Sequence, residues 1–186
     1  DLQLFLLWVQ TPTLWLHQYE EQIFPGGYTR YFNRTVLGWS NKKWPLDRSG
    51  VFWSNAPLSF VFFPLSAVIA GGVRGASGPV YAIWTAYFCI FSGFVKLCMF
   101  VYFGKYVPGL ITGLLVNVPI GVFTVWTYFE REDLPPHMHL IGIEIAFAIQ
   151  AGLMVYWFKF LHGYVLEKKA LQLQARNLRI AYISDV

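Results

Sequence analysis

Charged residues are scarce in this chain of 186 residues: lysine, arginine, aspartate and glutamate together make up 13% of it. Soluble globular domains carry about 25% charged residues, so the deficit argues against a soluble domain. Hydrophobic side chains account for 56% of the chain and aromatic side chains for 19%. Tryptophan and tyrosine concentrate where lipid meets water. The composition therefore predicts an integral membrane protein.

Cysteine is also rare, and several signature motifs are missing. Cys89 and Cys98 fall in one apolar run, where a helix would separate them by roughly 13 Å along its axis, too far for a disulfide. The chain has no phosphate-binding glycine loop, no Gly-x-Ser-x-Gly, no Cys-x-x-Cys and no His-Glu-x-x-His. These absences argue against a nucleotide site, a hydrolase nucleophile elbow, a redox dithiol and the common zinc-protease site.

No linker-like segment, low-complexity segment or internal repeat divides the chain, so we predict one compact bundle over residues 1–163 and a tail over 164–186. The net charge is +4. Because the basic residues flank apolar runs, this charge indicates membrane orientation and argues against nucleic-acid binding.

Five apolar runs approach the roughly 20 residues with which a helix crosses a bilayer. They cover residues 2–24, 51–70, 79–103, 109–129 and 140–160. Pro57 and Pro64 predict a kink in the second run. Small residues four apart, which let helices pack closely, occur at Ala67/Gly71, Gly109/Gly113 and Ala148/Gly152. We therefore predict an all-α, integral membrane bundle of about five transmembrane helices.

Basic residues concentrate in alternate connections between these runs. Residues 28–50 contain five basic residues against Asp47 alone, and further basic residues occur at Lys105 and in the tail, at Lys168, Lys169, Arg176 and Arg179. With five spans, these three segments lie on the same side of the membrane. The positive-inside rule then places the N-terminus outside the cell and the C-terminus in the cytoplasm.

Two segments are predicted to lie at the membrane surface. Residues 28–50 alternate aromatic and basic residues too irregularly for a span. We interpret them as an interfacial segment on the cytoplasmic leaflet, with the basic groups toward the headgroups and the rings in the acyl boundary. The tail, residues 164–186, contains helix formers with scattered leucines and is predicted to form a basic amphipathic helix at the surface or against a partner.

The first apolar run ends in three titratable residues, His17, Glu20 and Glu21. In a helix they stand at i, i+3 and i+4, which are neighbours on one face. An imidazole and two carboxylates at the end of a hydrophobic helix are costly to desolvate singly. They are tolerated where they meet water, one another, a cation or a metal. These residues are therefore the candidate functional site.

Two further residues are predicted to join them. With five spans, His162 ends the fifth run on the same side as His17, and Lys96 lies near that side in the third run. We expect His17, Glu20, Glu21, Lys96 and His162 to converge. Three other titratable residues belong to the opposite side and should not reach them: His137, His139 and Glu144.

Three hypotheses compete for this cluster. In the first, His17, Glu20, Glu21 and His162 hold a divalent metal such as zinc, iron or manganese, which imidazole and carboxylate ligands suit. In the second, no metal is present, and His17 works with Glu20 as an acid–base pair on a lipid or other apolar substrate, with Glu21 and Lys96 in support. In the third, the residues are structural, and Glu20 or Glu21 pairs with Lys96 or an arginine.

Two stretches together resemble a known family. His17-x-x-Glu20-Glu21, followed by Phe24-Pro25-Gly26-Gly27-Tyr28, resembles the signature of the small bacterial membrane proteins grouped as the HXXEE-motif family. The stretch Tyr106-Val107-Pro108-Gly109-Leu110-Ile111-Thr112 resembles that family's Tyr-x-Pro-Gly-Leu-x-Thr run, which opens a later span. The resemblance implies the membrane architecture, the site and the bacterial inner membrane. It implies no reaction, because the family has no settled activity.

The chain departs from the family pattern in one place. The helix before the second motif often carries an asparagine and then a histidine four residues on, and Ser92 and Lys96 occupy the corresponding positions here. If that histidine completes a metal site in relatives, the resemblance implies that this chain has lost the site and kept the scaffold.

Two functions of different class follow. On the sequence alone we favour an accessory subunit of a larger membrane assembly, whose aromatic spans pack against partner helices or pigments. The alternative is a membrane-embedded enzyme, either metal-dependent or metal-free, that acts on a lipid or other apolar ligand through His17, Glu20 and Glu21. A transporter ranks third, because five spans without a repeat do not match inverted-repeat designs.

Overall fold

The computed structural model describes residues 2–38, 46, 48–72, 78–130 and 134–157, with isolated positions 166, 170, 173 and 174 in the tail. Every regular element within these ranges is a helix. The predicted all-α class is therefore confirmed.

Four helical rods are long and apolar enough to cross a membrane, and they span Arg48–Gly72, Pro79–Phe103, Leu110–Glu130 and Pro136–Tyr156. The first consists of α3 (Arg48–Pro57), η2 (Leu58–Phe62) and α4 (Phe63–Gly72), and the second of η3 (Pro79–Tyr81) and α5 (Ile83–Phe103). The third consists of α6 (Leu110–Thr112), η4 (Gly113–Asn117) and α7 (Val118–Glu130), and the fourth is α8 (Pro136–Tyr156). These four rods correspond to the second to fifth apolar runs of the sequence.

Proline accounts for the irregular turns inside two of these rods. The segments η2 and η4 are π-helical, and each ends two residues before a proline, Pro64 and Pro119 respectively. A proline ring clashes with the carbonyl group four residues earlier, and that carbonyl belongs to the π-helical turn in both rods. A widened turn accommodates the ring without breaking the helix. The irregularity predicted for the second run thus takes the form of a π-helical turn.

The first apolar run forms α1 (Leu2–Gln22), which is as long as a membrane span but not as apolar as the four rods. Its buried side is polar and includes Gln10, Thr13 and His17, whereas large apolar residues such as Phe5 and Trp8 are exposed. This arrangement is the reverse of that in a soluble protein, and it suits a helix whose outer face meets lipid. Four of the five predicted spans are therefore apolar rods, and the remaining one, α1, is a helix of similar length with a mostly polar buried face.

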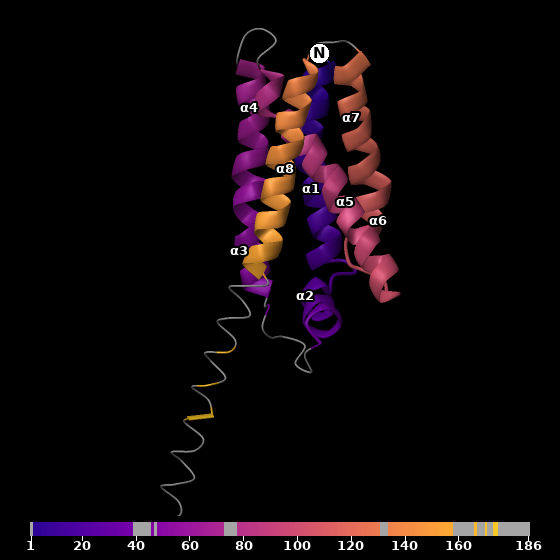
Figure 1. The fold of residues 1–186 in the computed structure, drawn as a ribbon, viewed down its shortest axis with the longest axis vertical. Coiled ribbons are helices and arrows are strands. Elements are labelled where there is room, and N and C mark those ends of the chain that lie inside the picture. The colour runs from indigo at the N-terminus through magenta and orange to yellow at the C-terminus, as the bar shows by residue number, and fades with distance from the viewer. Residues whose placement is uncertain are drawn as a thin grey trace, which may run out of the picture.

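The long helices run side by side along the long axis of the molecule (Figure 1). The N-terminus lies at one end of the bundle, and α2 (Tyr28–Tyr31) lies at the other (Figure 1). α5 packs against α1, α7 and α8, and α1 also packs against α4 and α7. α1 and α5 are therefore in contact with each other and with most of the remaining rods, which places their facing side chains inside the bundle.

Part of the predicted interfacial segment is described, as α2 followed by η1 (Phe32–Val36). Arg30 and Arg34 are exposed, as expected. The rings of Tyr28 and Phe32 are buried and lie 5.6 and 5.8 Å, centroid to centroid, from the ring of Trp157. They pack onto the bundle, not into the acyl boundary as predicted. The predicted tail helix, residues 164–186, falls outside the described residues apart from four positions.

Candidate functional site

His17 sits on the buried face of α1, one turn before the helix ends, and is 2% exposed. Its Nε2 atom lies 3.1 Å from Ser92 Oγ on α5, and its Nδ1 atom lies 3.2 Å from Thr112 Oγ1 in α6. Both ring nitrogens therefore have a hydroxyl partner from a different rod. The imidazole is fixed in orientation by the packing of three helices.

The hydrogen-bond network defines the tautomer of this imidazole. Thr112 Oγ1 donates its one proton to Glu20 Oε2, at 2.5 Å. A hydroxyl that donates to a carboxylate accepts from its other neighbour, so in the neutral imidazole Nδ1 carries the proton and donates a hydrogen bond to Thr112 Oγ1. His17 Nε2 is then unprotonated and accepts the hydroxyl proton of Ser92. The chain of contacts runs from Ser92 through His17 and Thr112 to Glu20.

The Glu20 carboxylate caps the N-terminal end of the third rod. It accepts hydrogen bonds from the backbone N–H groups of Ile111 (3.1 Å) and Thr112 (2.6 Å), and from the hydroxyls of Tyr106 and Thr112 (both 2.5 Å). The first N–H groups of a helix lack partners within the helix and carry partial positive charge, which favours an anion there. Burial, and then the Glu20 carboxylate, raises the pKa of Tyr106 well above its usual range. Tyr106 therefore stays a neutral donor.

Glu21 points to the other side of His17 and pairs with Lys96. Glu21 Oε1 forms an ion pair with Lys96 Nζ and lies 3.5 Å from His17 Nε2. Lys96 Nζ also stands 3.9 Å from the ring centroid of Tyr28, in a cation–π contact. Lys96 is only 5% exposed, and a buried ammonium requires such compensation.

Glycine lets the second motif approach α1 closely. Gly109 has a φ of 88°, and a Cβ atom there would lie 2.7 Å from Glu21 Cγ and 2.8 Å from His17 Cε1. A Cβ atom on Gly113 would lie 3.3 Å from the Cα atom of Gly93 in α5. The predicted close packing at Gly109/Gly113 is confirmed, whereas no atom of the described residues lies within 4 Å of a Cβ atom on Gly152.

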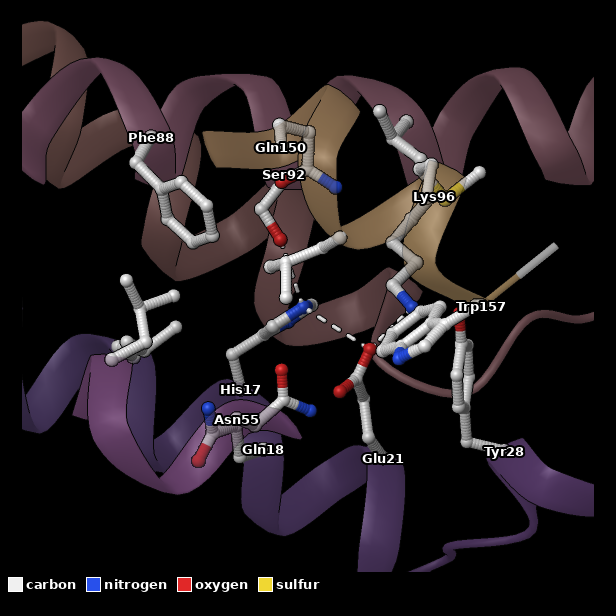
Figure 2. Close-up of a pocket in the computed structure, with 15 residues that line it drawn as sticks. His17, Gln18, Glu21, Tyr28, Asn55, Phe88, Ser92, Lys96, Gln150 and Trp157 are labelled. Atoms are coloured by element: carbon white, nitrogen blue, oxygen red, sulfur yellow. Dashed lines mark hydrogen bonds and ion pairs between the residues drawn. The ribbon is translucent and has the colours of Figure 1, made fainter. Parts of the chain in front are cut away.

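A small cavity of about 40 Å³ adjoins these residues. His17, Glu21, Ser92 and Lys96 line it, and it is bounded further by residues of α1, α2, α3, η2, α5, α8 and the position after α8. Figure 2 shows the His17 ring between Ser92 and Glu21, with Lys96 and Tyr28 beyond Glu21. A water molecule needs roughly 10–15 Å³ on this measure. The cavity therefore admits a small polar group next to the imidazole.

The predicted convergence holds in part. His17, Glu21 and Lys96 meet, as expected, and the ion pair of the structural hypothesis is present. Glu20 turns toward the start of the third rod and reaches His17 through Thr112. His162 lies outside the described residues. Among the residues that are described, no three His, Cys, Asp or Glu side chains form a group that could hold a metal ion, and the Lys96 ammonium occupies the position next to Glu21. The metal hypothesis therefore has no donor set in the described structure.

Sequence reasoning assigned no role to Ser92, Thr112, Tyr106 or Tyr28, although each contacts a motif residue. The two family stretches contained a signal that could have identified three of these residues, because Tyr28 ends the first stretch and Tyr106 and Thr112 begin and end the second. The motif residues of one stretch bind those of the other. Ser92 and Lys96, noted only as departures from the family pattern, both face α1.

The opposite end of the bundle holds a separate histidine, as predicted. His139 Nδ1 lies 2.9 Å from Tyr87 Oη, and the ring stacks on Phe129 with 4.2 Å between centroids. His139 is at the start of α8, whereas His17 is near the end of α1, next to α2. His139 therefore serves as an internal comparison: it is a buried histidine remote from the motif.

The described residues have the features of a polytopic helical membrane protein: four rods long and apolar enough to cross a membrane, exposed aromatic and aliphatic surfaces, and a buried cluster of charged residues. A family model described as "Protein of unknown function with HXXEE motif" matches residues 8–124. The chain belongs to this family. Neither a search of curated proteins nor a search of solved structures finds a match.

Proposed function

We propose that the chain is a membrane-embedded enzyme in which His17 acts as general base and then general acid on a polar group of a lipid or other apolar substrate. The observation that carries this proposal is the orientation of His17. Its Nδ1 is held through Thr112 by the Glu20 carboxylate, while its unprotonated Nε2 faces Ser92 beside the cavity. A base whose tautomer is held by a second group is a recurring arrangement in acid–base catalysis.

The charges around the ring suit proton transfer. When His17 gains a proton on Nε2, the imidazolium lies 3.5 Å from Glu21 Oε1 and one hydroxyl away from Glu20. Both carboxylates stabilise the charged ring, and the Lys96 ammonium offsets one of their two negative charges before the proton arrives. Such fixed charges act strongly in a buried site, because little water screens them.

The surroundings favour an apolar substrate with a small polar end. The cavity is lined by apolar residues as well as polar ones, among them Leu14, Phe88 and Leu153. Its volume of about 40 Å³ accommodates a carbonyl or hydroxyl group but no complete lipid. The remainder of the substrate would extend between the rods toward their outer faces, which are apolar. The proposed substrate class is thus a lipid with one reactive polar group.

We place the site at the cytoplasmic end of the bundle, in the bacterial inner membrane. Arg30, Arg34 and Lys105 belong to the connections at the end where the motif lies, which supports this orientation through the positive-inside rule. The test is Lys105→Cys in a background that lacks Cys98, so that the buried Cys89 is the remaining natural cysteine. A membrane-impermeant maleimide should label it in inverted vesicles and not in intact cells. The reverse pattern would refute the orientation.

The proposed activity is tested on purified protein in nanodiscs made from a bacterial polar lipid extract, with lipid mass spectrometry before and after incubation. We expect one lipid class to decrease and a product to accumulate with the unaltered protein. His17→Gln should lower this turnover by at least about 100-fold, the range that a general base contributes. His139→Gln is the matched control, since it alters a buried histidine remote from the motif, and it should retain the activity.

The accessory-subunit role remains the competing prediction. No lipid change with well-folded protein, together with co-purification of other membrane proteins at a fixed ratio in both histidine variants, would refute the enzyme and support the subunit. Equal lipid turnover in His17→Gln and the unaltered protein would refute the role of His17 specifically.

A further inference from the structure

We propose that Ser92 is the nucleophile of this site and that the substrate is a carboxylic ester of a lipid. This inference rests on the proposed function and names its reaction as acyl transfer from the ester to Ser92. The observations that carry it are the contact of Ser92 with an oriented histidine and the position of Ser92 on the cavity wall.

The Ser92 hydroxyl meets the geometric requirement for an activated nucleophile. Its Oγ atom lies 3.1 Å from His17 Nε2, the nitrogen that the Thr112–Glu20 contact leaves unprotonated. A serine within hydrogen-bond reach of a base, with the base oriented by a third group, is recognised by this geometry and not by sequence position. The absence of Gly-x-Ser-x-Gly therefore leaves the assignment intact, because Ser92 stands on a helix and not on a strand-to-helix turn.

Other buried serines lack this environment. Ser59 Oγ donates to the backbone carbonyl of Asn55 at 3.0 Å and accepts from Gln18 Nε2 at 2.5 Å. Ser66 Oγ lies 3.1 Å from Trp84 Nε1, which donates to it. Ser92 differs from both in having an imidazole as its partner. Ser59, which is fully buried, provides a matched control for the loss of one buried hydroxyl.

A cation is available for the negative charge that develops on the ester. Lys96 follows Ser92 by four residues on α5, so the two side chains are neighbours on one helix face, and both line the cavity. An ammonium beside the attacked carbonyl stabilises the oxyanion of the tetrahedral intermediate. Gln150 lines the same cavity, and its buried Oε1 atom has no hydrogen-bond partner within the described part of the chain. That oxygen is suited to accept a hydrogen bond from water or an alcohol.

The steps balance without any further reactant except water. Ser92 Oγ forms a bond to the carbonyl carbon as its proton passes to His17 Nε2, and the carbonyl electron pair moves onto the oxygen. The pair returns, the carbon–oxygen bond to the lipid alcohol breaks, and that alcohol takes the proton from His17. Water then attacks the acyl-Ser92 ester, gives one proton to His17, and releases the carboxylic acid as Ser92 regains its hydroxyl proton. One ester and one water yield one acid and one alcohol.

The test uses a long-chain alkyl fluorophosphonate, which phosphonylates activated serines with loss of fluoride, on the full chain in detergent. Peptide mass spectrometry should locate the adduct on Ser92. Ser92→Ala should lose the labelling, Ser59→Ala should label as the unaltered protein does, and His17→Gln should label at least about 100-fold more slowly. Labelling of Ser92 at equal rates in His17→Gln and the unaltered protein would overturn the proposal.

A second variant covers the case in which Ser92→Ala folds poorly. Ser92→Cys replaces one oxygen atom by sulfur and puts a thiol against His17. Made without Cys98, it leaves buried Cys89 as the remaining natural thiol. N-ethylmaleimide should alkylate it at least about tenfold faster than it alkylates the same variant carrying His17→Gln, because the imidazole deprotonates the thiol. Equal rates would overturn the proposal.

The two proposals fail differently. Lipid turnover that requires His17, with no adduct on Ser92 and full activity in Ser92→Ala, would overturn the nucleophile and retain the acid–base enzyme. Absence of both lipid turnover and labelling would overturn both. An adduct on Ser92 that requires His17, with release of fatty acid from the lipid extract, would support both.

Discussion

The Glu20 carboxylate joins the two family motifs through four hydrogen bonds, and Glu20→Gln tests this contact with almost no change of shape. The carboxylate accepts four hydrogen bonds, two of them from backbone N–H groups at the start of the third rod. The amide offers only one acceptor oxygen, and its NH₂ group must face donors. The hydroxyls of Tyr106 and Thr112 can rotate to other acceptors, but one backbone N–H group is left facing a donor.

The expected cost follows from these losses. A hydrogen bond to a charged group contributes about 1.5–3 kcal/mol, and a negative charge at a helix N-terminus contributes about 0.3–1 kcal/mol. We therefore expect Glu20→Gln to lower the free energy of unfolding by about 2–4 kcal/mol. For a chain of this size, a loss of about 3 kcal/mol corresponds to a decrease in melting temperature of roughly 6–12 °C.

The assay uses a natural reporter. The thiol of Cys89 is fully buried and Cys98 is exposed, so in a Cys98→Ser background a thiol-reactive fluorescent dye reports unfolding on heating. Glu144→Gln is the matched control, because it makes the same chemical change at an exposed position of α8, and its melting temperature should stay within about 1 °C. If Glu20→Gln melts together with Glu144→Gln, the carboxylate does not hold the third rod and the reasoning is refuted.

Two further changes probe the same region with the same dye assay. Gly109→Ala should lower the free energy of unfolding by more than the roughly 1–2 kcal/mol of a left-handed backbone, because the new Cβ atom would also meet His17 at 2.8 Å. Gly152→Ala is the control: no atom of the described residues lies within 4 Å of its new Cβ atom, so it should melt as the parent does. Equal melting of both variants would contradict the packing argument. Lys96→Met should lower the free energy of unfolding by about 3–5 kcal/mol, because it leaves the buried Glu21 carboxylate without its cation. Adding Glu21→Gln should restore part of that loss. Simple additivity of the two losses would contradict the ion pair.

Much of the architecture could be predicted from composition and apolar runs alone. The second to fifth runs became the four apolar rods, because about 20 apolar residues satisfy both the bilayer and the backbone hydrogen bonds of a helix. α1 was harder to classify. Its polar residues lie on the face that other rods cover, and no local pattern shows which face of a helix will be covered.

The amino-acid sequence by itself determined which residues have a high desolvation cost on burial: His17, Glu20 and Glu21 at the end of an apolar helix, and Lys96 inside another. It did not determine their partners. Only the tertiary structure brings Glu20 into contact with the start of the third rod, Glu21 with Lys96, and Ser92 with His17. The physical reason is that hydrogen bonds and ion pairs act over about 3–4 Å, whereas these partners lie 75 to 92 residues apart along the chain.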